Sequence, residues 1–221
     1  MKSLKSMFGT LVILLGLTSA SNAAGMEGLY FEVGSSAAGV AVDGNATDTG
    51  SNSTTVGSAG KTALIAHFGG GYMTNKSSMF GIDVGYMFTP GSAKIKRTSD
   101  TTGSDVTFEI SDSREYYIAP MMNITEDASL YVKFGRNDAD IKTTGDVTKL
   151  NSMDGNTLAV GTVMSWGSNL YIRSEAGMTE YDKLTASGLG NTIGTDETVT
   201  ANPEVYYGRI AIGYKFELIK I

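Results

Sequence analysis

Apolar and polar residues alternate with a period of two in eight segments of the chain, and no sustained 3.6-residue pattern occurs after the first 23 residues. This alternation is typical of β-strands, because successive side chains of a strand point to opposite faces of the sheet. The pattern predicts an all-β chain. Its eight strands are expected near residues 28–36, 62–73, 79–89, 106–122, 128–138, 156–166, 169–182 and 203–217.

The connections between these segments alternate between short and long. Short turns are expected at Asn75–Ser78, Thr125–Asp127 and Gly167–Ser168, and long polar connections at Asp43–Lys61, Gly91–Asp105, Thr144–Asn156 and Thr185–Pro203. Barrels that cross an asymmetric membrane have short periplasmic turns and long external loops. The alternation therefore predicts an eight-stranded antiparallel up-and-down transmembrane β-barrel whose long connections are extracellular.

The two faces of the predicted strands differ in composition. One face is apolar and uncharged, whereas the other mixes glycine with tyrosine and charged residues. A soluble barrel would show the same alternation with the apolar face inside. Glycine weakens a solvated strand, but in a narrow lumen it leaves room for large side chains, and buried charges of opposite sign pair. We therefore expect a polar core in the lumen, formed by Glu32, His67, Asp83, Lys133, Arg173, Glu175, Arg209 and Lys215.

The fourth predicted strand does not fit this scheme, because either parity places Arg114 or Glu115 on the apolar face. Its register stays open. The third and fourth strands are expected to continue beyond the membrane, since Ile95, Phe108 and Ile110 maintain the alternation past Phe88. The exposed edge of this hairpin is a candidate binding surface.

Aromatic residues stand near the ends of the apolar faces, where barrels carry girdles at the two membrane interfaces. We expect such girdles from Tyr72, Phe80, Phe88, Phe134, Trp166, Tyr206, Tyr214 and Phe216.

The first 23 residues have the layout of a secretory signal peptide, with Lys2 and Lys5, an apolar run from Phe8 to Leu17, and small residues up to Ala23. Residues 24–221 are expected to form one barrel domain. The chain has no cysteine, so disulfides do not stabilise it. Its 17 basic against 23 acidic residues, without a basic stripe, exclude nucleic acid as a partner.

The segments "GLYFEVGSS", "MFGIDVGYMF", "ASLYVKFGR" and "YYGRIAIGYKF" resemble strands of the bacterial outer-membrane β-barrel family of small porin-like, OmpA/OmpX-type proteins. The resemblance covers residues 24–221 and implies a Gram-negative outer membrane, with its lipid and lipopolysaccharide as partners. It also implies recognition of the last strand by the barrel-assembly machinery. Relatives usually end at the aromatic residue, whereas Glu217–Ile221 follow Phe216 here. The implied role is structural or interactive, through external loops that bind a surface ligand.

Candidate chemistry within the predicted lumen is sparse. His67 is the single histidine, Asp83 on the neighbouring strand is its candidate partner, and no serine completes a set, so we expect no enzyme and no cofactor. Asn137–Asp140 has only part of a calcium-loop pattern, and no metal is expected. Eight strands leave an interior that side chains fill. A narrow porin-like channel and a lipid-modifying enzyme remain as alternatives.

Overall fold

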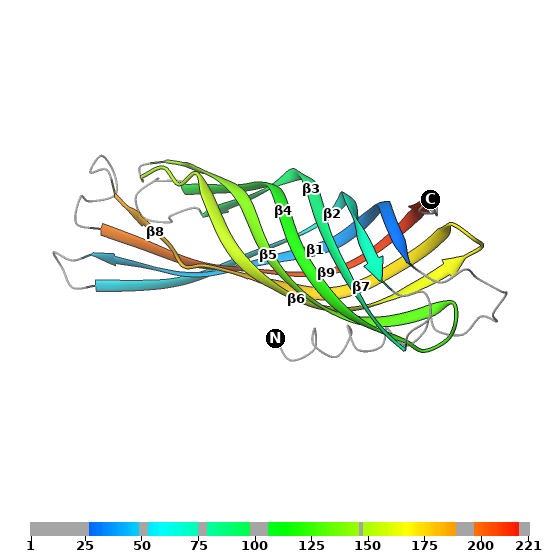
Figure 1. The fold of residues 1–221 in the computed structure, drawn as a ribbon. Coiled ribbons are helices and arrows are strands. Elements are labelled where there is room, and N and C mark those ends of the chain that lie inside the picture. Colours follow the sequence, from blue (N-terminus) through cyan, green and yellow to red (C-terminus); the bar gives the residue numbers. More distant parts are fainter. Residues whose placement is uncertain are drawn as a thin grey trace.

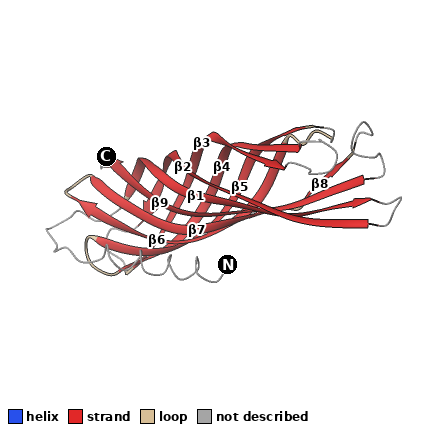
Figure 2. Cartoon of the chain, turned by 180° about the vertical axis from the view of Figure 1, so that it is seen from behind, coloured by secondary structure: helices blue, strands red, loops and turns tan. Residues whose placement is uncertain are grey.

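The computed structural model describes residues 27–48, 53–74, 79–97, 106–145, 148–188 and 197–216. Almost all of them are in strands (Figure 2). The strands are β1 (Gly28–Asp48), β2 (Ser53–Thr74), β3 (Phe80–Arg97), β4 (Val106–Asn123), β5 (Ala128–Thr144), β6 (Ser152–Trp166), β7 (Leu170–Tyr181), β8 (Leu184–Ser187) and β9 (Glu197–Phe216). In the described part of the chain, no helix has the length and apolar character needed to cross a membrane.

Eight of these strands form a closed antiparallel barrel (Figure 1). Each of β1 to β6 pairs with the next strand, β7 pairs with β9, and β9 pairs with β1 to complete the ring. The short strand β8 pairs with β9 beyond the end of β7, from Leu184 opposite Ala201 to Ser187 opposite Thr198. The eight-stranded barrel predicted from the sequence is confirmed.

The two ends of the barrel differ. At one end, which we call the short-turn end, tight connections follow β4 and β6: Ile124 donates a backbone hydrogen bond to Ala128, and Gly167 has a φ of +78°. Gly28 and Phe216 also lie at this end, where they begin β1 and end β9. The turn expected at Asn75–Ser78 lies outside the described residues, as do the signal peptide and Glu217–Ile221. We call the opposite end the long-hairpin end.

Most of the residues expected in long connections belong to strands instead. Of the predicted connection Asp43–Lys61, residues 43–48 extend β1 and residues 53–61 extend β2, paired from Asp43 opposite Ser58 to Asp48 opposite Ser53. The expectation of a loop is wrong here. The segment is rich in Ser, Thr, Gly and Asn and has no apolar alternation, so its strand pairing leaves no hydrophobic signal. The predicted extension of β3 and β4 is confirmed, because Ala93 to Arg97 pair with Ile110 to Val106.

A bulge in β4 explains why one alternation of inward and outward residues could not be assigned to the whole strand from the sequence. The pairing of β4 with β3 and with β5 shifts near Asp112, which has a φ of +50°. Glu115 is buried in the lumen, whereas Arg114 lies on the outer face with Asp138 and Asp140. Beyond the bulge the inward positions change from odd to even numbers, since Ile110 faces the lumen.

The ladder between β2 and β3 is short. It runs only from Phe68 opposite Phe88 to Thr74 opposite Ile82, although both strands continue toward the long-hairpin end. Beyond it β3 carries Pro90, which has no amide hydrogen to donate, and Gly91 with a φ of +111°. Figure 1 shows the ends of β1, β2 and β9 running together, apart from the β3–β4 hairpin. Among the described residues, positions 53–67 of β2 and 89–97 of β3 are not paired with each other, and we call this gap the seam.

Candidate functional site

The outer face of the barrel carries a continuous band of exposed apolar side chains. Phe31, Val84 and Ile212 are each about half exposed, and so are many others at equivalent positions: Leu29, Val33, Ile82, Ile118, Val132, Leu158, Val160 and Ile210. An apolar surface of this extent is unstable in water and marks contact with lipid. Outward charged residues such as Arg114, Arg136 and Glu180 begin only toward the long-hairpin end.

The aromatic residues expected in girdles all lie on the outer face. Phe80, Trp166, Tyr214 and Phe216 are exposed near the short-turn end, and Tyr72 is half-buried there. Phe134, Phe88 and Tyr206 lie farther along the strands, just before the outward charges begin. The Tyr206 hydroxyl donates a hydrogen bond of 2.6 Å to Glu204.

Inside the barrel, a first charged cluster is centred on Arg173 of β7. Its Nε lies 2.9 Å from Glu32 Oε2, and its Nη1 lies 2.8 Å from Asp83 Oδ2, the latter an ion pair without hydrogen-bond alignment. The Tyr30 hydroxyl donates to Asp83 at 2.7 Å, and the Tyr171 hydroxyl donates to Glu32 at 2.8 Å. All three charged side chains are almost completely buried. One guanidinium thus holds two carboxylates in the middle of the lumen.

A second cluster lies on the long-hairpin side of the first. Lys133 Nζ is 2.7 Å from Glu175 Oε1 and 3.0 Å from Glu115 Oε1. Arg209 adds an ion pair from Nη1 to Glu115 Oε2 at 3.3 Å. The Tyr207 hydroxyl donates to Glu175 at 3.0 Å, and its ring stacks against the Arg209 guanidinium at 3.9 Å. We call the two clusters together the floor. They interlock side chains from six strands across the barrel.

Glycines give the large lumen side chains their space. A side chain at Gly213 would clash with the Tyr171 ring, and one at Gly161 would clash with the Tyr131 ring. Tyr131 donates a hydrogen bond of 2.7 Å to Glu175. Small inward residues therefore stand beside the tyrosines of the floor, as expected for a narrow lumen.

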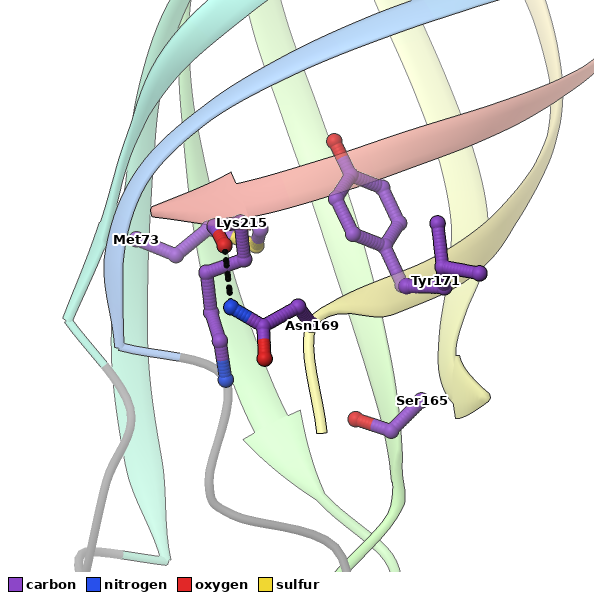
Figure 3. A pocket seen from close by; sticks show the side chains of 6 residues that line it. Met73, Ser165, Asn169, Tyr171 and Lys215 are labelled. Atoms are coloured by element: carbon purple, nitrogen blue, oxygen red, sulfur yellow. Dashed lines mark hydrogen bonds between the residues drawn. The ribbon is translucent and has the colours of Figure 1, made fainter. Parts of the chain in front are cut away.

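His67 and Lys215 also lie in the lumen, outside the ion pairs described for the floor. His67 Nδ1 is 3.0 Å from the Ser36 hydroxyl, and Asp83 pairs with Arg173 instead. The candidate His67–Asp83 pair is therefore wrong, because Arg173 reaches Asp83 from across the lumen. Lys215 lies at the short-turn end, where its carbonyl accepts a hydrogen bond of 3.0 Å from Asn169 (Figure 3). The depression around it encloses no space for a water molecule.

Between the floor and the long-hairpin end, the lumen contains a cavity of about 90 Å³. This is room for several water molecules. Arg209 and Ser36 line it next to the floor, and its apolar wall is formed by Ala38, Val40, Ile65, Ala93, Ile110 and Val205. The seam runs along one side of the cavity, because Ile65 of β2 and Thr89, Pro90 and Gly91 of β3 all line it.

Farther toward the long-hairpin end the inward side chains are mainly apolar. Ile141, Met153, Tyr181 and Leu184 form a buried cluster, and Phe108 packs against it. The sequence interpretation placed the polar face of the predicted strands inside the barrel. The structure concentrates the buried ion pairs in the floor, and β1, β2 and β9 extend beyond it with small and apolar inward residues such as Ala38 and Ala201.

Several important lumen residues were not identified from the sequence. Glu115 was left without a face, and the bulge at Asp112 was not foreseen. Ser36 and Tyr30 both lie in the lumen, but apart from their inward position in the alternation nothing in the sequence marked them as important. Within the described residues, no group of three or more His, Cys, Asp or Glu is arranged to hold a metal ion.

Comparison with known proteins finds similarity in structure but not in sequence. No protein-family model and no curated protein matches the chain. The outer membrane protein OprG from Pseudomonas aeruginosa superposes with a TM-score of 0.60 at 15% identity, covering 89% of this chain and 100% of OprG. The outer membrane protein AlkL, solved in lipid bilayers, gives a TM-score of 0.52 at 17% identity, covering 94% and 99%. The Escherichia coli outer membrane protease OmpT gives 0.48 at 8% identity, covering 86% and 97%.

At these identities the likeness concerns the fold. It agrees with two observations made on this chain itself, the closed ring of eight strands and the exposed apolar band around it. The chain has the fold of these eight-stranded barrels, and its exposed apolar band indicates a barrel that spans a lipid bilayer.

Proposed function

We propose that the protein takes up small apolar or amphipathic molecules into the cavity from the cell surface and releases them sideways, through the seam, into the outer membrane. The observation that carries this proposal is the position of the cavity, which lies between a charged floor and a lateral gap in the barrel wall. Concave sites with mainly apolar walls and a few polar groups are typical binding sites for small molecules.

The floor is an argument that a molecule in the cavity leaves sideways and does not pass through the whole barrel. Lys133, Arg173, Glu32 and Asp83 are almost completely buried and joined by ion pairs, so passage toward the short-turn end would separate buried charges. The narrow-channel alternative would require this. It predicts conductance steps in planar bilayers, which we expect to be absent.

The proposal places the long-hairpin end outside the cell, since external connections of such barrels are the long ones. A peptide tag inserted between Asp48 and Ser53 is expected to be accessible to antibody on intact cells, whereas a tag at Glu126 is not. Export through the signal peptide, insertion by the barrel-assembly machinery and contact with lipopolysaccharide belong to the same proposal. Access to Glu126 alone would invert the topology.

The direct test is uptake of an apolar fluorophore, N-phenyl-1-naphthylamine, by cells that express the protein at the surface. Ile65 lines the cavity, whereas the adjacent Leu64 points outward and is 79% exposed. Ile65→Trp is expected to reduce uptake to that of cells without the protein, and Leu64→Trp is the matched control with normal uptake. Equal uptake by both variants and by cells lacking the protein would contradict the proposal.

A second candidate function is binding of a partner protein at the cell surface, through strand addition. It is favoured by the seam, because β2 and β3 each present backbone groups there that no neighbouring strand occupies among the described residues. A lipid-modifying enzyme is less well supported, since His67 meets Ser36 but Asp83 belongs to the Arg173 cluster. Unchanged lipid A and phospholipid acyl chains on overexpression would agree with this order.

A further inference from the structure

The cavity has one charged group at its base, Arg209. The Arg209 side chain is only 9% exposed, and it lines the cavity next to Ser36, its partner across the β1–β9 ladder. A buried guanidinium needs partners for its five N–H groups. How far the protein satisfies them therefore indicates what the cavity can accept.

The protein satisfies Arg209 only in part. Both described hydrogen bonds of this side chain leave from Nη1, toward Glu115 and the sulfur of Met87. Its Nε lies 3.5 Å from Glu175 Oε1 without hydrogen-bond alignment and is buried with no hydrogen-bond partner among the described residues. A buried donor without an acceptor is destabilising. A ligand in the cavity that brings an acceptor to this guanidinium would add a hydrogen bond to the two that leave from Nη1.

The charge of the floor restricts the kind of acceptor. Four carboxylates, those of Glu32, Asp83, Glu115 and Glu175, face three cations, those of Lys133, Arg173 and Arg209. With His67 neutral, the floor already has one negative charge in excess. A carboxylate or phosphate in the cavity would enlarge this excess in a poorly solvated site, which is unfavourable. Asp112 also lines the cavity and adds a further negative group.

An ammonium group is excluded by a different argument. It carries donors but no acceptor, so it cannot satisfy the N–H groups of Arg209, and it would approach a like charge. An uncharged acceptor such as a carbonyl, ether or hydroxyl oxygen meets both conditions. The remainder of the ligand would contact Val40, Ile65, Ile110 and Val205.

We propose that the cavity selects uncharged amphipathic molecules, with an apolar body against the cavity wall and one oxygen acceptor hydrogen-bonded to the guanidinium of Arg209. This inference rests on the proposed uptake function and specifies its substrate class. Apolar molecules without an acceptor, fatty carboxylates and alkyl amines bind less well.

The test uses four probes of equal chain length: 2-octanone, octane, octanoate and octylamine. The full-length protein is refolded into lipid nanodiscs with isotope-labelled arginine, and the guanidinium NMR signals of Arg209 are followed during titration. Signals are assigned with Arg209→Lys, and the Arg173 signal serves as the internal control because its Nε already donates to Glu32. Methyl signals of Ile65, Ile110 and Val205 report occupancy of the cavity independently.

We expect 2-octanone to shift the Arg209 signal saturably and the Arg173 signal not at all, with binding at least tenfold tighter than that of octanoate or octylamine. Ile65→Trp should abolish the shift, and Leu64→Trp should preserve it. Octanoate or octylamine binding as tightly as 2-octanone would overturn the neutral-acceptor assignment. If octane and 2-octanone bind equally by the methyl signals, Arg209 selects nothing, but the uptake function stands. If no probe moves the methyl signals, both proposals fail.

Discussion

The two halves of the lumen are built from the same strands but in different ways. Toward the short-turn end the lumen is filled by interlocked charges and tyrosines, in which Arg173 alone joins Glu32 of β1 to Asp83 of β3. Toward the long-hairpin end the inward side chains are mainly small or apolar, and they enclose a cavity beside an incomplete ladder. A network of buried ion pairs requires fixed geometry, whereas an apolar wall tolerates a gap. The comparison assigns a structural role to the floor, and it places the proposed ligand site in the region on the long-hairpin side of the floor.

The largest effect is expected from breaking the floor. Arg173→Met leaves two buried carboxylates without their cation and should destabilise the barrel by about 3–5 kcal/mol. The measurement is the urea midpoint of the refolded protein, read from its heat-modifiable mobility on gels. Arg136→Met is the control, because Arg136 pairs with Asp154 and Asp182 on the exposed outer face and should change stability by less than about 1 kcal/mol. Similar losses for both variants would mean that the floor is not a structural unit.

The second test introduces a charge on the lipid face at the level of the floor. Ile212 is 51% exposed in the apolar band and pairs with Val33 and Ile172. Ile212→Arg should cost about 2–4 kcal/mol, as a cation does at the middle of the bilayer on this face. Ser152 lies on the same outer face, beyond the band and opposite Asp140. The control Ser152→Arg should therefore lower the free energy of unfolding by only about 0–1 kcal/mol. The measurement is the urea midpoint of each variant in lipid vesicles. A higher midpoint for Ile212→Arg than for Ser152→Arg would contradict the assignment of the band to lipid.

A smaller effect is expected at the bulge that borders the cavity. Asp112 has a φ of +50°, a conformation that aspartate tolerates better than alanine and that glycine adopts freely. Asp112→Ala should lower stability by about 1 kcal/mol, whereas Asp112→Gly should be close to neutral. The urea midpoints of the two variants provide the measurement. If the alanine variant is as stable as the glycine variant, the bulge is not held in this conformation.

The smallest effect concerns the β3–β4 hairpin outside the membrane band. The pKa of Glu109 lies below its ordinary value. The larger cause is a hydrogen bond from Ser92 to the carboxylate, and the smaller cause is the positive charge of Lys94. A lowered pKa stabilises the hairpin above the ordinary glutamate pKa of about 4.3, and this contribution disappears as pH falls through the folded-state value. Amide exchange at Ala93–Ile95 and Phe108–Ile110, corrected for intrinsic rates, should be faster in acid by less than about fivefold. In Glu109→Gln the acid-induced difference should vanish.

The strands and their inward and outward faces could be predicted, because the apolar alternation of segments such as Phe80–Phe88 is strong and local. Strand extensions made of Ser, Thr and Gly were missed, since backbone pairing alone holds them and leaves no periodic signal. The partners in the floor were also out of reach. Which charges meet across a lumen depends on the stagger of the strands around the ring, and nothing in the sequence near His67 shows that Asp83 belongs to Arg173.

Trp166 is the one tryptophan of the chain, and it stands 62% exposed at the end of β6, opposite the cavity along the barrel. Its emission therefore reports on the lipid at the short-turn end. A blue shift on insertion, quenched by brominated acyl chains, would follow the barrel into the bilayer. Occupation of the cavity would leave this chromophore in the same surroundings, whereas the proposed ligand would contact Tyr181 and Tyr207, which line the cavity. The natural placement of the indole thus separates membrane insertion from ligand binding in a single optical experiment.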